Sequence, residues 1–333
     1  MSQYRIDQIT NQAGTAGPQV AGITTFSGVS GIIMPSGAEE YRGGRGRGLF
    51  GGGRGTPGSN TIQYVTISTT SNAYDFGDLT AGRRWSAACA SSTRGIWGGG
   101  ETGPSNVLDY VTISSTGNAF DFGDLFVARG NIASCSSNIR GIWAGGNAPG
   151  AVTTIDYVTI SSLGNASFFG DLTNACSYSN GVSSQTRGVF NLGIISPLAV
   201  NVMNYITIAS TGNAIRFGDL TLSRFADGSC SNSIRGLFGG GYLAPTGNSN
   251  VIDYITIAST GNAISFGQLT VARGALAAVS SSTRGVFGGG VSPTFTSTTD
   301  FVAISSTGNA SSFGSLLSGD AYMGACSNGH GGL

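Results

Sequence analysis

The chain has 333 residues, of which 56 are glycine and only 10% are charged, against about 25% in an ordinary globular protein. Its sixteen basic residues are all arginine, and its sixteen acids are thirteen Asp and three Glu, so the formal net charge is zero. So little Glu and no Lys exclude amphipathic surface helices, coiled coils and helical repeats. Glycine without a three-residue period excludes collagen, and 40% apolar residues exclude a disordered glycine-rich tract. The composition predicts an all-β protein with many tight turns.

Charge and hydropathy also narrow the expected partners. A net charge of zero argues against a general nucleic-acid binder, which needs a broad cationic surface. No apolar run approaches the roughly 20 residues of a membrane span, so we expect no membrane insertion. The opening MSQYRIDQITNQAG has no apolar core of a secretory signal, and the five cysteines are scattered singly. These features predict folding in a reducing cytoplasm.

Residues 1–41 lie outside any repeat. Their short β-prone pieces (IDQIT, AGITTF, SGIIMPSG) are separated by Gly and Pro and are too small for a core of their own. We therefore expect an N-terminal anchoring or assembly extension over 1–41, followed by a repeat domain over 42–333.

Three motifs recur six times in the repeat domain. The first is Arg-Gly, an aliphatic residue and an aromatic residue, usually followed by glycines, at spacings of 47, 46, 47, 48 and 49 residues. The second resembles DYVTIS at Asp109, and the third is FGDL, as from Phe122, or a close variant. Each unit therefore predicts four short strands, which in the second unit are Ser86–Ser91, Arg94–Gly98, Tyr110–Ser114 and a strand running into FGDL. The STGNA segment between the last two predicts a type II′ hairpin turn.

A four-stranded unit of 46–49 residues repeated six times predicts a six-bladed β-propeller. The first unit lacks a first strand, because Ala38–Gly46 is polar and glycine-rich, whereas Ala325–Asn328 (ACSN) echoes Ser229–Asn232 (SCSN). We expect the C-terminal strand to complete the first blade and close the ring. The alternatives are a β-solenoid, whose coils are about half as long, and a trimeric fibre shaft.

The repeat resembles kelch-type propeller repeats from about residue 42 to the end. The resemblance rests on a hydrophobic strand ending in Gly-Gly, an acidic-aromatic strand, and an aromatic residue and an Arg before the next blade. The chain departs from it at Phe76, Phe122 and Phe169, where kelch blades usually carry Trp, and at Asn191–Leu192, where the glycine run is lost.

Repeated charged residues are expected to tie the blades together through charge-assisted hydrogen bonds. The expected structural set is Arg47, Arg94, Arg140, Arg187, Arg235, Arg284, Asp78, Asp124, Asp171 and Asp219. Two further sets recur beside it, namely Asp109, Asp156, Asp253 and Asp300, and Arg83, Arg129, Arg224 and Arg273. The alternative is an anion-binding ring of guanidinium groups, with a local anion contact in Arg42–Gly55 as a further alternative.

Residues for catalysis or metal binding are scarce. The single histidine, His330, has no Ser or Cys constellation around it, which excludes His-based triads and multi-histidine metal sites. We expect no enzyme, no metal site and no cofactor. Paired carboxylates are the alternative, and the unrepeated acids are Glu101, Asp227 and Asp320.

The cysteines follow the repeat. Cys89, Cys135 and Cys230 occupy equivalent first-strand positions, Cys326 is their equivalent in the closing strand, and Cys176 falls off register. We expect buried free thiols that pack as small apolar residues.

The loop between the second and third strands varies between units, although each copy contains proline. In a four-stranded blade these loops share one face with the connections between blades, while the STGNA segments lie on the opposite face. Because function on a scaffold resides in its loops, the variable face is the candidate recognition surface, with neutral spacers as the alternative. The expected binding residues are Asn60, Glu101, Asn147, Tyr242, Asn248 and Thr294.

The opening IDQITNQAGTAGP…GITTFSG…GIIMPSG resembles the N-termini of tail-fibre and other virion proteins of marine tailed phages, especially cyanophages. The STGNAxxFGDL repeats resemble those of predicted phage structural proteins, so the resemblance spans the whole chain. It implies a tail-associated or surface-projecting virion protein, assembled in the host cytoplasm and present in multiple copies per particle. It also implies that residues 1–41 dock on other virion proteins, while the propeller mediates assembly or contacts a host-surface glycan or protein. The alternatives are a kelch-like protein-binding adaptor, a capsid decoration protein, and an anionic-glycan hydrolase that depends on Glu101 or Asp320.

Overall fold

The computed structural model describes residues 46–54, 58–101, 103–245 and 247–329, and the backbone of 26–27 and 31–32. The chain divides into two units, residues 1–44 and 45–333. In the first unit, β1 (Phe26–Ser27) pairs antiparallel with β2 (Gly31–Ile32). The expected anchoring role of residues 1–41, and the expected boundary after residue 41, lie outside the described residues.

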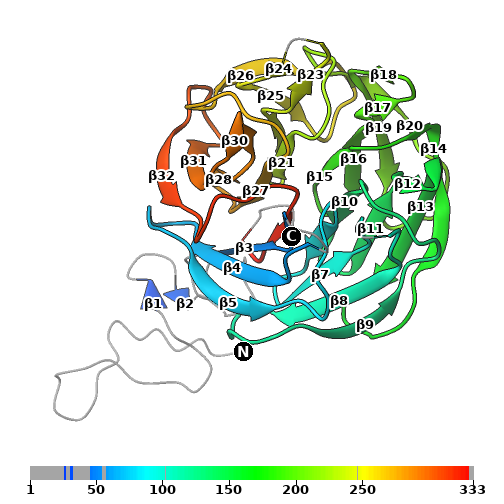
Figure 1. Ribbon diagram of the computed structural model, residues 1–333, viewed down its shortest axis with the longest axis horizontal. Helices are drawn as coiled ribbons and strands as arrows, with labels where there is room; N and C mark the ends of the chain where they lie inside the picture. Colours follow the sequence, from blue (N-terminus) through cyan, green and yellow to red (C-terminus); the bar gives the residue numbers. More distant parts are fainter. Residues whose placement is uncertain are drawn as a thin grey trace, which may run out of the picture. The chain divides into compact units, whose positions relative to one another are not determined.

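The second unit is a ring of six antiparallel sheets around a central axis, as Figure 1 shows. All regular secondary structure in the described ranges is β-strand. Each sheet runs from an innermost strand near the axis to an outermost strand at the rim. The expected all-β, six-bladed propeller is therefore confirmed, and the solenoid and the fibre shaft are excluded.

The strands of each blade follow one another from the axis outward. Blade 1 consists of β33 (Gly324–Ser327), β3 (Arg47–Gly51), β4 (Thr61–Thr66) and β5 (Tyr74–Asp78). Blade 2 consists of β6 (Ala87–Ala90), β7 (Arg94–Gly98), β8 (Val107–Thr112) and β9 (Phe120–Asp124). Blade 3 consists of β10 (Ala133–Ser136), β11 (Arg140–Ala144), β13 (Gly150–Thr159) and β14 (Ser167–Cys176).

The remaining blades have the same order. Blade 4 consists of β15 (Asn180–Ser183), β16 (Arg187–Asn191), β19 (Val202–Thr207) and β20 (Ile215–Asp219). Blade 5 consists of β21 (Gly228–Ser231), β22 (Arg235–Gly239), β25 (Val251–Thr256) and β26 (Ile264–Gln268). Blade 6 consists of β27 (Ala277–Ser280), β28 (Arg284–Gly288), β31 (Thr298–Ala303) and β32 (Ser311–Ser315).

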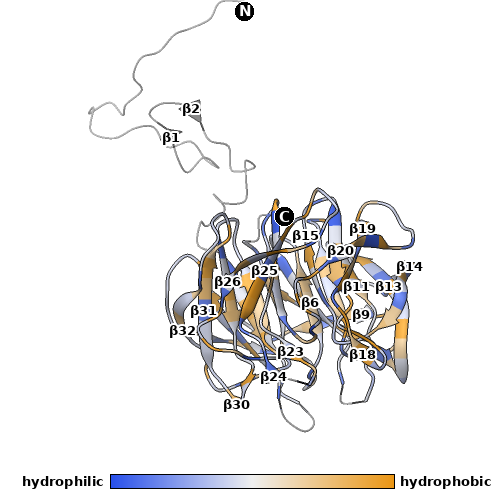
Figure 2. Cartoon of the chain, turned by 90° about the horizontal axis from the view of Figure 1, so that it is seen from above, coloured by the Kyte–Doolittle hydropathy of each residue, from blue (hydrophilic) through white to orange (hydrophobic). Residues whose placement is uncertain are grey.

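Short strands occupy the variable loops between the second and third strands. They are β12 (Asn147–Ala148), β17 (Ile194–Ile195), β18 (Leu198–Ala199), β23 (Tyr242–Leu243), β24 (Gly247–Asn248), β29 (Val291–Ser292) and β30 (Thr294–Phe295). Seen edge-on in Figure 2, β18, β23, β24 and β30 lie together at one face of the propeller. The variable loops therefore share a face, as expected.

The ring closes through the C-terminal strand. β33 pairs antiparallel with β3, with Cys326 opposite Leu49 and Gly324 opposite Gly51. Blade 1 thus joins both ends of the repeat domain, which confirms the expected closure.

Two local expectations in blade 2 are wrong. The third strand, β8, begins at Val107 and ends at Thr112, because Val107 and Leu108 already pair with β9, and a bulge follows Leu108. The STGNA segment is not a two-residue turn, since seven residues, 113–119, separate β8 from β9.

The STGNA segment instead pairs with the preceding blade. The N–H of Gly117 donates to the carbonyl oxygen of Phe76 at 2.8 Å, and the N–H of Ala119 donates to that of Asp78 at 2.7 Å. Equivalent bonds recur around the ring, and Ala73 closes it by donating to the Ser315 carbonyl oxygen at 2.8 Å. The segment therefore covers part of the outer edge of the neighbouring blade, where free strand edges would otherwise invite association.

Packing between blades explains why glycine recurs in the second strand of the repeat. A Cβ on Gly141 would lie 2.6 Å from the Cys89 Sγ of the preceding blade. A Cβ on Gly98 would lie 2.7 Å from Nε1 of Trp143 in the next blade. Core clusters likewise draw buried side chains from neighbouring blades, as in the cluster that contains Phe122 of blade 2 and Trp143 of blade 3. These repeated glycines are required by close contact between sheets.

Candidate functional site: the axial collar

The connections between blades bring one residue each to the central axis. Every one of these residues donates its backbone N–H to the carbonyl oxygen of its counterpart in the preceding connection, at 2.7–3.1 Å. The six bonds form a closed ring, in which Trp85 donates to Tyr322 at 2.8 Å and so joins the two ends of the domain. We call these residues the axial collar, namely Trp85, Asn131, Tyr178, Ala226, Ala275 and Tyr322.

The collar backbone is strained. All six residues have positive φ, between 51° and 67°, and they are the non-glycine residues with positive φ in the described part of the chain. Bulky residues such as Trp85 and Tyr178 rarely adopt this conformation, which costs on the order of 1–3 kcal/mol each. The hydrogen-bonded ring holds the conformation. Strain of this kind clusters at functional sites, which makes the collar the leading candidate.

The collar side chains do not follow the repeat. The scaffold repeats Arg, Gly, Phe and Asp from blade to blade, whereas the six collar positions carry Trp, Asn, Tyr, Ala, Ala and Tyr. A symmetric backbone therefore presents an asymmetric set of side chains at the axis.

Aromatic rings form a continuous patch around the collar. The ring of Trp85 lies 4.4 Å from that of Tyr322 and 4.9 Å from that of Tyr178, measured between centroids. The patch extends from Tyr178 to Phe225 at 5.8 Å and from Phe225 to Tyr242 at 5.4 Å. Trp85, Tyr178 and Tyr242 are half-buried, so they keep part of their surface for a partner.

The collar surrounds a hollow in which the centres of water molecules can occupy about 40 Å³. Its lining includes the polar residues Ser86, Asn131, Ser179 and Asp227. It also includes the apolar residues Ile132, Leu276 and Met323.

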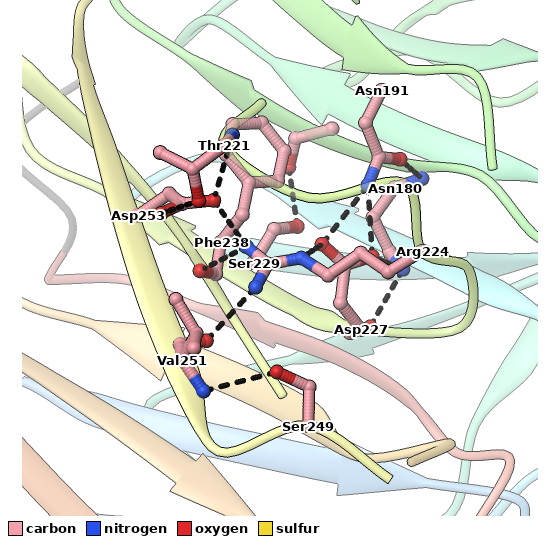
Figure 3. A network of polar contacts seen from close by, with 11 residues as sticks. Asn180, Asn191, Thr221, Arg224, Asp227, Ser229, Phe238, Ser249, Val251 and Asp253 are labelled. Carbon is pink, nitrogen blue, oxygen red and sulfur yellow. Dashed lines mark hydrogen bonds and ion pairs between the residues drawn. The ribbon is translucent and has the colours of Figure 1, made fainter. Parts of the chain in front are cut away.

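A buried polar network supports the wall of this hollow (Figure 3). The Nδ2 of Asn191 donates to both carboxylate oxygens of Asp227 at 2.9 Å, and the Nδ2 of Asn180 donates to Oδ1 at 3.0 Å. Burial raises the pKa of Asp227, while Arg224 and the amide hydrogen bonds act in the opposite direction. In the fourth unit, Asn191 replaces the glycine of the repeat. This substitution supplies a hydrogen-bond donor for Asp227.

The structure places two of the six expected binding residues at the collar. The Oε1 of Glu101 accepts a hydrogen bond from Asn131 at 3.1 Å, and Tyr242 belongs to the aromatic patch. The Nδ2 of Asn248 instead donates to the Val291 carbonyl oxygen at 2.7 Å, which links two blades.

The other three expected binding residues make no collar contact in the described structure. Asn147 exchanges two backbone hydrogen bonds with Gly130, at 2.8 and 3.1 Å. Asn60 and Thr294 are exposed on the loops.

None of the six collar residues was predicted from the sequence. A signal was present, because these residues stand at equivalent positions before the first strand, where the six units disagree. Their convergence at one axis follows only from the closed ring.

The Arg-Gly arginines contact carbonyl oxygens and aromatic rings. The Nη1 of Arg94 donates to the Ile160 carbonyl oxygen of the next blade at 3.0 Å, and its guanidinium lies 4.9 Å from the Tyr110 centroid. The same two contacts recur for Arg47, Arg140, Arg187, Arg235 and Arg284. These residues therefore tie neighbouring blades together without a carboxylate partner.

The FGDL aspartates do not join those arginines. Their backbone N–H groups donate to the Asn side chain of the next STGNA segment at 3.0–3.1 Å, which holds for Asp78, Asp124, Asp171 and Asp219. The carboxylate of Asp219 pairs only locally, with the exposed Arg216 at 2.8 Å. The expected charge-assisted hydrogen bonds through the FGDL carboxylates are thus not formed with the Arg-Gly arginines.

The other two repeated sets form the buried ion pairs. Nη2 of Arg83 lies 2.6 Å from Oδ2 of Asp109. The equivalent distance from a guanidinium nitrogen to a carboxylate oxygen is 3.1 Å in the pairs Arg129–Asp156, Arg224–Asp253 and Arg273–Asp300. Each pair joins a connection to the third strand of the blade that follows it.

Blades 4 and 1 lack both the arginine and the aspartate of this pair. Cys176 stands in the arginine position before blade 4, where the aspartate position holds Asn204. Asp320 stands there before blade 1, where the aspartate position holds Gln63. The third strand thus carries this aspartate only where an arginine faces it, since an unpaired buried charge is costly.

The unrepeated acids are held by separate partners. Asp320 accepts hydrogen bonds from the backbone N–H groups of Arg54 and Ala321, both at 2.8 Å, while Asp227 belongs to the amide network. His330 and residues 42–45 and 55 of the Arg42–Gly55 stretch lie outside the described residues.

All five cysteines are free and buried, as expected. Burial raises the pKa of Cys176 and Cys230 to about 12. Their thiols therefore pack as neutral groups.

Among the described residues, there is no helix long and apolar enough to cross a membrane. The chain matches no protein-family model, and it matches no curated protein.

Proposed function

We propose that this chain is a virion structural protein that binds the host surface through the axial collar. The single observation that carries the proposal is the collar itself, a strained and closed backbone ring with non-repeating, half-buried aromatic side chains. The likeness of the opening residues and of the STGNA repeats to phage virion proteins supports the choice of a virion.

The scaffold residues already have structural roles. The glycines fit neighbouring blades, the Arg-Gly arginines bridge blades, and the second arginine set pairs with buried aspartates. Those contacts do not require Trp85, Tyr178 or Tyr322 at the collar, because Ala226 and Ala275 maintain the same backbone ring. Aromatic side chains dominate many recognition surfaces, since they offer large, rigid contact area.

Binding fits the collar better than catalysis. Glu101 is engaged by Asn131, and Asp227 is surrounded by two amides and an arginine. Residues 1–41 would dock on other virion proteins in this proposal, and several copies per particle would strengthen attachment through multivalency.

Adsorption of the labelled full chain to host cells tests the proposal. Trp85→Ala together with Tyr322→Ala should reduce cell binding at least tenfold, whereas Asn60→Ala and Thr294→Ala should leave it unchanged. All variants must retain the wild-type circular dichroism spectrum and denaturation midpoint.

Mass spectrometry of purified virions supplies the second test, because the chain should be present. Its absence from virions, or equal cell binding by folded collar variants and wild type, would contradict the proposed function.

A further inference from the structure

The hollow inside the collar contains polar atoms without partners. Ser86 Oγ, Asn131 Oδ1 and Ser179 Oγ make no hydrogen bond within the described structure, although these residues are at most 7% exposed. All three residues line the hollow. An unsatisfied buried polar group costs about 1–3 kcal/mol, so three around one space indicate an occupant that bonds to them.

The hydrogen bond between Asn131 and Glu101 determines which atom of the Asn131 side chain is available to a ligand. Its Nδ2 donates to Oε1 of Glu101 at 3.1 Å, and a carboxylate can only accept. Oδ1 is therefore the free atom, and it requires a donor. The two serine hydroxyls can donate as well as accept, so they suit a carbonyl oxygen.

An apolar side of the hollow is formed by the connections entering blades 6 and 1, which contribute Ala275, Leu276 and Met323. The unpaired atoms come from the connections entering blades 2, 3 and 4, where Ile132 adds a further apolar side chain. The free volume of about 40 Å³ corresponds to roughly three or four water molecules, at about 10–15 Å³ each. The hollow thus fits a neutral group of similar size that carries a donor, an acceptor and an apolar end.

We propose that the axial hollow receives the acetamido group of an N-acetylated sugar. This inference rests on the proposed recognition role of the collar and names its ligand class. The acetamido N–H matches Asn131 Oδ1, the carbonyl oxygen matches a serine hydroxyl, and the methyl group matches the apolar side. The half-buried rings of Trp85 and Tyr322 offer aromatic surface at the rim for the sugar ring.

The chain contains its own probe for a binding test. Of its three tryptophans, Trp97 and Trp143 are 0% exposed, whereas Trp85 is half-buried at the collar. Intrinsic fluorescence of the full chain should therefore report on the collar. The matched ligands are triacetylchitotriose and cellotriose, which share a backbone and differ in the acetamido groups.

We expect saturable quenching or enhancement by triacetylchitotriose, with at least tenfold weaker binding of cellotriose. Asn131→Leu and Ser179→Ala should each weaken triacetylchitotriose binding about tenfold, while Asn60→Ala should not change it. Equal binding of the two trisaccharides, no fluorescence response to either, or unchanged affinity in both variants would overturn the inference. A crystal structure that shows only water in the hollow at saturating triacetylchitotriose would overturn it independently of variant folding.

The cell-adsorption assay separates this inference from the proposed function. Adsorption that depends on the collar but resists competition by triacetylchitotriose overturns the sugar assignment and leaves the proposed function standing. Binding of triacetylchitotriose in solution without collar-dependent adsorption overturns the proposed function and supports the assignment.

Discussion

Ser136 clamps Ala90 of the preceding blade, because its Oγ donates to the Ala90 carbonyl oxygen at 2.8 Å and accepts from the Ala90 N–H at 3.3 Å. The same double contact recurs from blade to blade around the central axis. The clamping serines are Ser136, Ser183, Ser231, Ser280 and Ser327. The sixth position holds Ala90, so no hydroxyl from this position clamps Ser327, and the ring of side-chain contacts has one gap.

Filling this gap should stabilise the propeller. Ala90→Ser adds one hydroxyl opposite the backbone of Ser327, and we expect the free energy of unfolding to rise by about 1 kcal/mol. Ser231→Ala, which opens a second gap, should lower it by about 1–2 kcal/mol. Chemical denaturation in reducing buffer measures both changes. A loss of stability in Ala90→Ser would show that the gap cannot accept a hydroxyl.

The contact between Gly141 and Cys89 predicts a coupled pair of substitutions. Gly141→Ala should lower the free energy of unfolding by about 1–3 kcal/mol, since its Cβ would lie 2.6 Å from the Cys89 Sγ. Cys89→Ala removes that sulfur, so the double variant should be more stable than the sum of the single changes by about 1 kcal/mol or more. Gly150→Ala is the matched control, because its Cβ would meet nothing within 4 Å. Simple additivity in the double-mutant cycle would argue against this contact.

The exchange of Arg-Asp for Cys-Asn in blade 4 can be transferred to blade 3. Asp156→Asn alone leaves Arg129 without its carboxylate in a fully buried site and should cost about 3–5 kcal/mol. Adding Arg129→Cys reproduces the combination of residues that blade 4 has at these two positions, Cys176 and Asn204, and should recover at least half of that loss.

The substituted side chain at position 156 should also keep the backbone bond from Phe126, as Asn204 keeps the bond from Thr173 at 2.9 Å. Thermal and chemical denaturation of Asp156→Asn, Arg129→Cys and the double variant would measure the recovery. No recovery in the double variant would contradict the exchange.

The buried thiols predict low reactivity in the folded state. Because burial raises the pKa of Cys176 and Cys230 to about 12, almost no thiolate is present at a pH of about 8. Ellman's reagent should label essentially none of the five cysteines in the native protein within minutes, and all five in denaturant. Rapid labelling of the native protein under these conditions would contradict their burial.

Much of the fold could be predicted because the sequence repeats the same motifs in every blade. Six copies of Arg-Gly, and six of FGDL or a close variant, indicate the number of blades. The similarity of Ala325–Asn328 to Ser229–Asn232 identifies the closing strand. The hairpin turn expected in the STGNA segment is wrong because its hydrogen-bond partners, such as Phe76 for Gly117, belong to another repeat. A turn prediction considers only neighbours along the chain.

The charged residues show the same limit. Recurrence alone could not tell which arginines meet which aspartates. Both repeated aspartate sets were expected to form charge-assisted hydrogen bonds, whereas the buried ion pairs use the set that contains Asp109. The sequence did contain a signal for the correct pairs. In the two units where the arginine is replaced, by Cys176 and by Asp320, the aspartate is also replaced, by Asn204 and by Gln63 respectively.

Strand periodicity and repeat length are local properties, so the sequence was sufficient for an all-β ring of six blades closed by its C-terminal strand. The collar and its hollow depend on the tertiary structure. Trp85 and Tyr322 come from opposite ends of the domain, and their backbone bond exists only once the ring is closed. The six connections between blades are equivalent in backbone structure because the blades repeat. They meet at one axis, so their six unlike side chains lie together on a single surface.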